Sequence, residues 1–489
     1  MATPIPKNDA SFDVWEVAAI THGQATRVAG AGARGTFVTT DSRAVVSGSI
    51  FVALRGERVD GHEFVKTAEA SGAVIAVVER GQSSRATSCD VVEVDDTLLA
   101  LRMLGQAHLR AWRRAKPAGP RVVAITGSAG KTTTKELTRA LLQARRECHA
   151  TLGNLNNLIG APSVAFGLHS GFDAVVFELG MSVPGEIAAL AQMTEPDVGI
   201  ITNVGLAHAG GVGGTRSDVG REKGALFASL PEDAVAIVCA DDAAACGQLP
   251  RTRARQVLRF GRAVSAHYRL VDRGLSADGT PFLSFERGAV DVVPGPITIA
   301  FPLAGEAAAI DFLAALAAAE HVTGSAYAGP EIERALAGLA LSGRMALARL
   351  RGNVLLIDDS YNANPGSFRA ALGTAQELGQ TRRKVAVLGE MKELGAVATE
   401  EHDRLGDHLA QSGFALAIGC GGELVRRALR RAESLGLSVL EAHDADGAAE
   451  LLLSHVTDGD VVLVKGSRSA NTDRVAAALV RHRAPEARN

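Results

Sequence analysis

Short runs of consecutive apolar residues alternate with longer amphipathic stretches through most of the chain. Such runs are typical of strands buried on both faces, whereas the amphipathic stretches have the period of helices. The pattern therefore predicts parallel sheets covered by helices, which is an α/β fold. The predicted strands lie at residues 50–54, 74–78, 121–126, 174–177, 198–202, 234–238, 354–357, 384–388, 415–418 and 461–464.

Three regions differ in their pattern of apolar, charged and glycine residues, and we expect each to be a domain. Residues 1–112 carry short apolar runs and a loop rich in glycine and charge. Residues 113–120 are basic and contain two prolines and a glycine, which indicates a linker at the start of a central region that extends to residue 326. That region ends in an alanine-rich helix near 306–321. Residues 327–489 show the same alternation of strands and helices, which predicts a second open, Rossmann-like sheet.

Composition and charge exclude several classes of protein. The 489 residues include 51 Lys and Arg and 54 Asp and Glu, a net charge of −3, which argues against bulk nucleic acid or an anionic membrane as the main partner. The five cysteines show no CxxC spacing, so a disulfide framework is not expected and a reducing cytosol is the simplest setting. The chain starts without a signal-peptide pattern, and its most apolar stretch, 307–319, is too short to cross a bilayer. We expect a cytoplasmic protein.

A glycine-rich run, TGSAGKTTT at residues 126–134, follows one predicted strand and precedes a predicted helix at 135–143. Backbone N–H groups in such a turn point at phosphates, and the helix N-terminus adds positive potential. Lys131 would reach the β- and γ-phosphates, and the Thr132 hydroxyl would hold Mg²⁺. The pattern is the shorter form G-x-x-G-K-T, because Ile125 stands where the longer form has glycine. The candidate nucleotide-binding residues here are Gly127, Ser128, Ala129, Gly130, Lys131, Thr132 and Thr133.

Two further residues stand at the carboxyl ends of predicted strands, where open α/β sheets bind ligands. Glu178 ends the run DAVVFE, and His208 closes the run TNVGLAH. A strand-end glutamate is otherwise a solvated rim residue, and a lone histidine is most often structural. Their position beside the phosphate loop makes both candidate metal ligands.

In sequence order, five runs resemble the Mur ligases, enzymes that use ATP to add amino acids to the peptide of the cell-wall precursor. They are TGSAGKTTTKE, TLGNLNNLIGAP, FELGMSVPGEI, TNVGLAH and DDSYNANPGSF. Residues 41–64, LGEMKELG at 388–395 and VKGSR at 464–468 also resemble the family, so the likeness covers nearly the whole chain. The runs DSYNANP and GNLNN are similar to those of the ligase that acts last in the series.

The resemblance implies an ATP-dependent acid–D-amino-acid ligase of peptidoglycan synthesis, and hence a role in cell shape and division. It would phosphorylate the terminal carboxylate of UDP-N-acetylmuramoyl-tripeptide, and the amine of D-alanyl-D-alanine would attack the acyl phosphate. The three domains would then bind UDP, ATP and the incoming dipeptide in turn. ATP and two Mg²⁺ ions are the implied cofactors, and we expect a monomer whose third domain closes over the other two.

The resemblance also implies roles for individual residues. Lys131, Glu178, His208 and Lys223 would be catalytic, and Lys223 would be carbamylated so that it joins Thr132, Glu178 and His208 in holding the metal ions. Arg344 would touch the γ-phosphate and Asp359 the ribose. The implied substrate-binding residues are Ser42 and Arg43 for UDP, Asn154, Asn156 and Asn157 for the muramyl-peptide, and Tyr361, Asn362 and Asn364 for the dipeptide.

One motif departs from the family. A G-x-H-N-x-x-N run, whose asparagines read adenine, is usual at the start of the late helix of the central domain. Here Ala307 and Ala308 replace the histidine and the first asparagine, and Asp311 replaces the second. An ionised aspartate only accepts hydrogen bonds, whereas asparagine also donates. Adenine recognition is therefore expected to be weakened, relaxed towards other bases, or carried by other residues.

Two other functions stay open from the sequence. A related ligase that adds a diamino acid would carry an arginine-bearing run in place of 359–365. A nucleotide-binding regulator that has lost turnover would explain the altered adenine motif, although the retained Lys131, Glu178, His208 and Lys223 argue against it.

Overall fold

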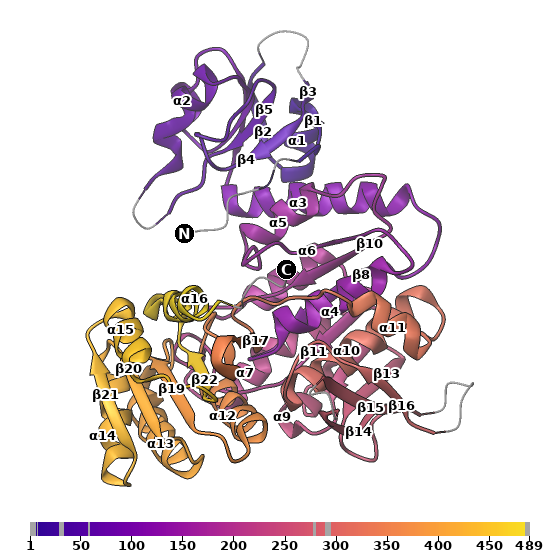
Figure 1. Cartoon of the computed structure of the whole chain (residues 1–489). Coiled ribbons are helices and arrows are strands. Elements are labelled where there is room, and N and C mark those ends of the chain that lie inside the picture. Colours follow the sequence, from indigo (N-terminus) through magenta and orange to yellow (C-terminus); the bar gives the residue numbers. More distant parts are fainter. Residues whose placement is uncertain are drawn as a thin grey trace, which may run out of the picture.

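A computed structural model of the chain describes residues 6, 8–28, 34–56, 59–276, 280–288 and 295–484. Its main sheets have five, nine and six strands and follow one another along the sequence, and Figure 1 shows them as three separate bodies. The predicted three-domain α/β architecture is therefore confirmed. Within the described part of the chain, no helix has the length and apolar character needed to span a bilayer.

The first domain is built on the five-stranded sheet, in the order β2-β7-β6-β5-β4. The pairs from β4 to β7 are parallel, and β2 runs antiparallel to β7. A small two-stranded sheet, β1-β3, lies beside it. The elements are β1 (Phe12–Asp13), α1 (Val14–Thr21), β2 (Gln24–Arg27), β3 (Arg34–Gly35), β4 (Phe37–Thr39), β5 (Ser49–Val52), α2 (Val65–Ala70), β6 (Ala73–Glu79), β7 (Asp90–Val94) and α3 (Thr97–Arg114).

The central domain holds the nine-stranded sheet, in the order β16-β15-β14-β13-β12-β11-β8-β10-β9. The strands from β9 to β14 pair in parallel, and β15 and β16 add an antiparallel edge. The strands are β8 (Val122–Thr126), β9 (Cys148–Ala150), β10 (Ala174–Glu178), β11 (Val198–Ile201), β12 (Val235–Cys239), β13 (Gln256–Gly261), β14 (Tyr268–Leu275), β15 (Pro281–Arg287) and β16 (Ile297–Ala300). The helices are α4 (Lys131–Gln143), α5 (Gly160–Phe166), α6 (Glu186–Thr194), α7 (Arg216–Lys223), α8 (Ala225–Ser229), α9 (Ala243–Cys246), α10 (Glu306–Thr323) and α11 (Gly329–Leu336).

Both faces of the central sheet are covered, as the continuous apolar runs predict. Successive side chains of β8 point to opposite faces, so Val123 and Ile125 enter one core while Val122 and Ala124 enter the other. Helices α4, α10 and α11 close the first core, and α5, α6 and α8 close the second. The sheet thereby holds the phosphate loop, which follows β8, in a rigid setting.

The third domain contains the six-stranded sheet, in the order β17-β18-β22-β19-β20-β21, parallel except for β17. The strands are β17 (Ala346–Leu350), β18 (Val354–Asp359), β19 (Lys384–Gly389), β20 (Leu416–Cys420), β21 (Ser438–Ala442) and β22 (Val461–Lys465). The helices are α12 (Pro365–Gly379), α13 (Ala398–Gln411), α14 (Glu423–Ser434), α15 (Ala445–His455) and α16 (Asp473–His482). The strand order places the ends of β18, β22 and β19 side by side.

Three details correct the sequence-based expectations. The linker predicted from residue 113 begins later, because α3 runs to Arg114 and Arg113 pairs with Asp197 at 2.8 Å. The helix predicted at 135–143 begins at Lys131, where Gly130 ends the phosphate loop. Strands β2, β4, β7, β9, β13 to β17 and β21 were not predicted, and the two-residue β1 and β3 are too short to leave a pattern.

Candidate functional site

The phosphate loop joins β8 to α4 and is fixed from both sides by the segment after β11. Asn203 accepts a hydrogen bond from the Ala129 N–H at 2.9 Å and donates to its carbonyl at 3.0 Å. The Thr202 hydroxyl donates to the same carbonyl at 2.6 Å. Gly130 has φ +80°, and a Cβ there would lie 2.2 Å from the Asp311 carboxyl oxygen. Only glycine fits this turn, so the sequence of the loop is dictated by its shape.

Glu178 lies directly against the start of α4. Its Oε2 accepts a hydrogen bond from the Thr132 hydroxyl at 2.7 Å, and its Oε1 accepts from the Asn156 side chain at 2.8 Å. The Glu178 backbone N–H donates to the Thr151 hydroxyl at 3.0 Å, which orients the end of β10. The structure thus joins Thr132, Glu178 and Asn156 in one chain of contacts, although they are far apart in the sequence.

Lys131 is the centre of the charged groups in the site. Its ammonium donates to the Gly127 carbonyl at 2.8 Å, inside the turn of the loop. Burial lowers the pKa of Lys131, the Glu178 and Glu393 carboxylates oppose that shift, and Arg344 reinforces it. The side chain is therefore surrounded by groups from three separate segments, and an anion placed here would meet a poorly solvated cation.

Lys223, at the end of α7, is only 1% exposed. Its ammonium contacts the Met181 sulfur at 3.8 Å. Burial, with Lys131 as a second cause, lowers the pKa of Lys223 far below its usual range. The adjacent Glu222 is turned away, towards the backbone N–H of Gly185 at 3.0 Å. Burial at this place therefore favours the neutral amine over the ammonium.

His208 lies on the seam between the central and third domains. It has φ +62°, and its Nδ1 contacts the carboxylate of Glu393, which lies in the run LGEMKELG. The backbones of Gly210 and Gly395 approach each other at the same place. In the described residues, His208 is thus engaged by the third domain and does not contact Glu178.

The oxygen pair of Thr132 and Glu178 fits Mg²⁺, which prefers hard oxygen ligands. No group of three or more His, Cys, Asp or Glu side chains with metal-site geometry occurs within the described ranges. A divalent ion at this point would therefore depend on phosphate oxygens and water to complete its shell, as Mg²⁺ commonly does.

The segment after β18 faces the phosphate loop. The Asn364 side chain donates to the Ser128 carbonyl at 3.3 Å, across the domain seam. Arg344 stacks on the Tyr361 ring, with its Cζ 3.9 Å from the ring centroid. Asp359 is engaged by Lys465, and the Asn362 carbonyl accepts from the same lysine at 3.0 Å. Burial raises the pKa of Asp359, and Lys465 opposes this.

The remaining predicted binding residues lie further out. Asn157 accepts from the backbone N–H of Gly160 at 2.8 Å and so caps the start of α5, while Asn154 is exposed in the same turn. Ser42 and Arg43 follow β4 in the first domain, where Arg43 pairs with Asp41 at 2.7 Å. Figure 1 shows β4 and β5 on the other side of α3 from α4. Their substrate contacts stay predictions.

The segment that departs from the adenine-reading motif forms part of the seam. Gly305 has φ +86°, and a Cβ there would lie 2.3 Å from the Thr374 hydroxyl of α12. Glu306 pairs with Arg262 at 2.9 Å and with Arg273, which in turn pairs with Glu377 of α12 at 2.6 Å. The Arg273–Glu377 pair holds α12 of the third domain to β14 of the central one.

Asp311 lies inside α10, against the phosphate loop, and is 7% exposed. Burial raises the pKa of Asp311 far above its usual range, and Arg344 opposes that shift. A protonated carboxyl both donates and accepts hydrogen bonds, as asparagine does. The structure thus gives a physical reason why aspartate is tolerated at this position.

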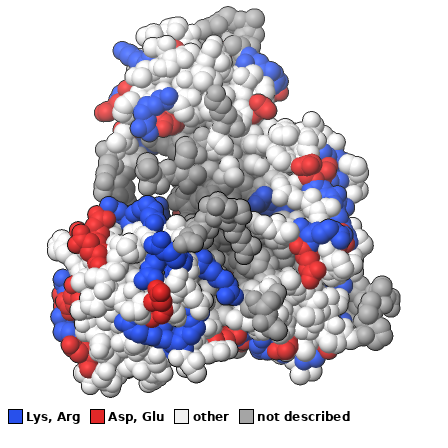
Figure 2. All heavy atoms as spheres, in the orientation of Figure 1, with Lys and Arg blue, Asp and Glu red and all other residues white. Residues whose placement is uncertain are grey.

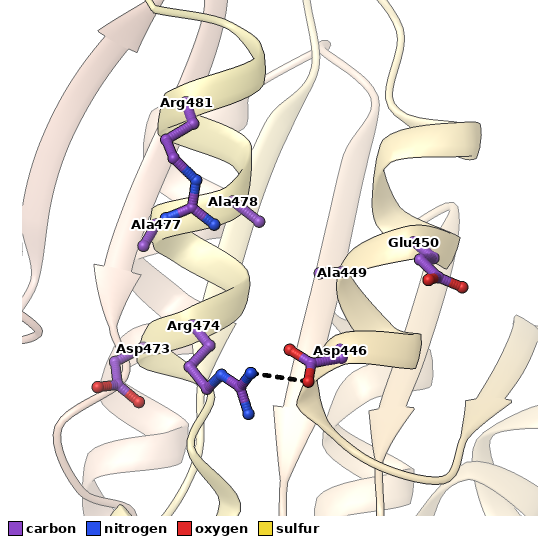
Figure 3. Close-up of a pocket in the computed structure, with 8 residues that line it drawn as sticks. All are labelled: Asp446, Ala449, Glu450, Asp473, Arg474, Ala477, Ala478 and Arg481. Atoms are coloured by element: carbon purple, nitrogen blue, oxygen red, sulfur yellow. Dashed lines mark ion pairs between the residues drawn. The ribbon is translucent and has the colours of Figure 1, made fainter.

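A separate cavity of about 390 Å³ lies on the outer face of the third domain, between α15 and α16 (Figure 3). Arg474 and Asp446 pair across it at 2.7 Å. No predicted site residue lines it. Figure 2 shows a hollow between the first and third domains, with Lys and Arg side chains gathered on the border that the third domain forms.

Four residues of the site were not predicted. Asn203 shapes the phosphate loop, Glu393 contacts His208, and Lys465 holds Asp359. Arg468 lies 6.0 Å from the centroid of the Tyr361 ring. All four belong to runs that resembled the family, so the signal was present, but their roles depend on contacts between segments far apart in sequence.

Comparison with known proteins finds similar proteins along most of the chain. It matches the family models "Mur ligase family, catalytic domain" over residues 34–106, "Mur ligase middle domain" over 125–319 and "Mur ligase, glutamate ligase domain" over 343–468. Relatives named UDP-N-acetylmuramoyl-tripeptide–D-alanyl-D-alanine ligase include those of Escherichia coli, 36% identical across 90% of this chain and 93% of that protein, and Treponema pallidum, 36% identical across 97% and 99%. Among solved structures, MurF of Acinetobacter baumannii aligns with a TM-score of 0.83 at 28% identity, covering 98% of this chain and 100% of that one. MurF of Thermotoga maritima in complex with ADP aligns with 0.79 at 28% identity, covering 91% and 97%.

Proposed function

The chain belongs to the Mur ligase family, and from this premise we propose that it joins D-alanyl-D-alanine to UDP-N-acetylmuramoyl-tripeptide with hydrolysis of ATP. The observation that carries the proposal is the full-length likeness to ligases with that name, at 36% identity. The run DSYNANP, which lies against the phosphate loop through Asn364, supports the same acceptor.

The reaction has two steps. Two anions, the carboxylate and ATP, react first, and the dipeptide amine then attacks their product. The terminal carboxylate of the tripeptide attacks the γ-phosphorus of ATP, and ADP leaves. The dipeptide amine then attacks the carbonyl carbon of the acyl phosphate and loses a proton, and inorganic phosphate departs from the tetrahedral intermediate. The first step needs strong neutralisation of charge, because phosphate and carboxylate repel each other.

Lys131 and Arg344 are the groups that we assign to that neutralisation. Lys131 lies inside the phosphate loop, and Arg344 comes from the third domain and influences Lys131 electrostatically. Thr132 and Glu178 would hold Mg²⁺, which supplies positive charge to the transferred phosphate when bound. His208, whose Nδ1 contacts Glu393, would offer its other ring nitrogen to a second ion. The third domain thus supplies part of the charge that the reaction needs.

We assign Lys223 a carbamate. Burial strongly lowers the pKa of its amine, and no ion pair of Lys223 occurs among the described residues, so the neutral form that adds CO₂ is favoured. The product is an anion with two oxygens, which suits a place beside Mg²⁺ and Lys131 where an ammonium would be repelled.

The three domains divide the substrates between them. Ser42 and Arg43 of the first domain would bind UDP, the Asn154–Asn157 turn would bind the muramyl-peptide, and the segment after β18 would receive the dipeptide. Because ATP and UDP-linked precursors are cytoplasmic metabolites, we place the reaction in the cytoplasm. We propose a monomer, since one chain supplies every group assigned here.

The test is phosphate release with ATP and UDP-N-acetylmuramoyl-tripeptide, with D-alanyl-D-alanine or with a free diamino acid as acceptor. We expect release only with the dipeptide. Release of phosphate with diaminopimelate or lysine, when a precursor with a shorter peptide replaces the tripeptide, would identify an earlier ligase of the series. No release with any acceptor would identify a nucleotide-binding regulator.

Replacing Asp311 with asparagine is expected to stabilise the protein above pH 7. Because burial raises its pKa in the folded state, this carboxyl lowers stability as pH rises from about 4 towards the folded pKa. Asparagine has the same shape and no such dependence. We expect the Tm of the variant to exceed that of the wild type by a few degrees at pH 8, about 1 kcal/mol or more, and by less at pH 5. Differential scanning calorimetry at both pH values checks this, and an equal difference at both would contradict it.

A further inference from the structure

Three loops of the third domain meet at the carboxyl ends of β18, β22 and β19. The Lys465 ammonium donates to the Asn362 carbonyl at 3.0 Å, which ties the end of β22 to the loop after β18. The Ser467 N–H donates to the Glu390 carbonyl at 3.2 Å, which ties the loop after β22 to the loop after β19. We call these loops, residues 360–364, 390–394 and 466–472, the acceptor cup.

The acceptor cup borders the phosphate loop. Asn364 at its edge donates to the Ser128 carbonyl of the phosphate loop at 3.3 Å. Glu393 at another edge contacts His208 and acts electrostatically on Lys131. A molecule bound to these three loops would therefore lie beside the phosphate loop.

Two arginines lie against one aromatic ring in this cup. Arg344 Cζ is 3.9 Å from the centroid of the Tyr361 ring, and Arg468 Cζ is 6.0 Å from the same point. The two guanidinium groups can therefore be separated by no more than the sum of these distances. Arg344 is the group on the phosphate side, because it influences both Lys131 and Asp311. Arg468 is then the second cation beside this ring.

The spacing suits an acceptor two residues long. An extended dipeptide spans about 7 Å from its amine to its carboxylate. If the amine faces the acyl phosphate beside Arg344, the carboxylate comes within reach of Arg468 near the same ring. The carboxylate carries a full negative charge and needs a cationic partner there.

Arg468 is the cation best able to supply that partner. It is 59% exposed on its side chain, and its one ion pair with another described residue is with Asp473 at 3.1 Å through a single nitrogen, Nη1. An exposed pair of this kind is weak, and a guanidinium has further N–H groups for a bidentate contact. Lys465 is buried and committed to Asp359, and Lys392 pairs with Glu390 at 3.0 Å.

We propose that Arg468 binds the carboxylate of the incoming D-alanyl-D-alanine and, with Tyr361, sets the length of acceptor that the site takes. This rests on the function proposed above, because it assumes a dipeptide acceptor. The contact would position the amine without taking part in bond formation, so it acts on the KM of the acceptor and little on the reactions of ATP.

The test compares D-alanyl-D-alanine with its carboxamide, D-alanyl-D-alaninamide, in wild type and Arg468→Ala. For wild type we expect the KM of the amide to be about 10- to 100-fold higher, the usual range for a charged hydrogen-bonded contact. Arg468→Ala should raise the KM of the dipeptide by a similar factor and show nearly equal KM values for the two acceptors. The KM of ATP should stay within about twofold in both proteins. Arg468→Lys should recover part of the loss, since lysine keeps the charge but not the bidentate geometry.

Arg474→Ala is the matched control. Arg474 lies on α16, is 60% exposed and pairs with Asp446, so it has the exposure and the pairing of Arg468 but lies outside the acceptor cup (Figure 3). It should leave both KM values unchanged. Equal KM values for D-alanyl-D-alanine and its carboxamide in the wild type would overturn the proposal. This comparison does not depend on the folding of any variant. A loss of discrimination in Lys392→Ala but not in Arg468→Ala would overturn it too. Failure of wild type to release phosphate with saturating dipeptide would instead reject the proposed function.

Discussion

Replacing Lys131 with alanine is expected to lower kcat about a thousandfold and to leave the fold intact. The ammonium is held inside the phosphate loop by the Gly127 carbonyl, where by our proposal it would meet the anion that gains charge in the transition state. Removal of one preorganised group of this kind costs about 10²- to 10³-fold in kcat, and a full charge belongs at the upper end. Because burial already disfavours the charged lysine, its loss should cost little stability. Phosphate release at saturating substrates and a thermal melt together check this.

Lys135 provides the contrast on the same helix. It is 1% exposed, and its ammonium donates to the Thr151 carbonyl at 2.6 Å and pairs with Glu136 at 2.9 Å. Lys135→Ala should therefore lower the Tm and leave the remaining folded protein active. A Lys131→Ala enzyme within about tenfold of wild-type kcat, or one that melts as early as Lys135→Ala, would show that Lys131 has a structural role instead.

The parts of the site that were predictable from the sequence are those formed by neighbouring residues. Gly127 to Thr132 form one turn, and a strand end followed by such a turn has a nearly fixed geometry. Glu178 was predictable because parallel strands present their carboxyl ends at one edge of a sheet. The contacts of His208 with Glu393 and of Asn364 with Ser128 were not, because they form only when two domains dock.

The errors in the fold have similar causes. The start of α4 was placed four residues late because its first turn contains three threonines, whose β-branched side chains disfavour helices. The phosphate loop overrides that preference by fixing the helix start at Gly130. Strands β14 to β16 were missed because they form a partly exposed antiparallel edge, with a register shift between Leu270 and Asp272, and so lack a continuous apolar run.

The net charge of −3 conceals a cluster of cations and carboxylates at the seam. Arg344 lowers the pKa of Lys131, the Glu178 and Glu393 carboxylates oppose that shift, and Lys131 in turn lowers the pKa of Lys223. Of the groups that the third domain brings to this cluster, Arg344 repels Lys131 and Glu393 attracts it, and bound anions would add to the attraction. Binding of ATP and the tripeptide carboxylate should therefore favour the docked arrangement, which couples closure to the presence of both substrates.

Lys223 has the most unusual environment of these groups. It is fully buried, it contacts a methionine sulfur, and the nearest charge that shifts its pKa is another lysine. An ammonium there would be unpaired and poorly solvated, a state that proteins avoid by losing the proton. The neutral amine can react with CO₂, and the carbamate proposed above would reverse the charge at this point from repulsive to attractive for Lys131 and a divalent ion.

Lys223→Ala is accordingly expected to lose at least about a hundredfold in kcat and to regain part of it with formate, acetate or propionate. The added carboxylate would occupy the space left by the side chain and replace the two carbamate oxygens. Wild-type turnover should also fall when CO₂ and bicarbonate are removed and recover when they return. Arg221→Ala is the control, since Arg221 lies on the same helix but is 72% exposed and pairs with Asp218, and it should need no rescue. If Lys223→Ala keeps wild-type turnover, or if its activity ignores both short carboxylates and CO₂, then the amine is a buried structural group and the metal charge must be balanced by substrate alone.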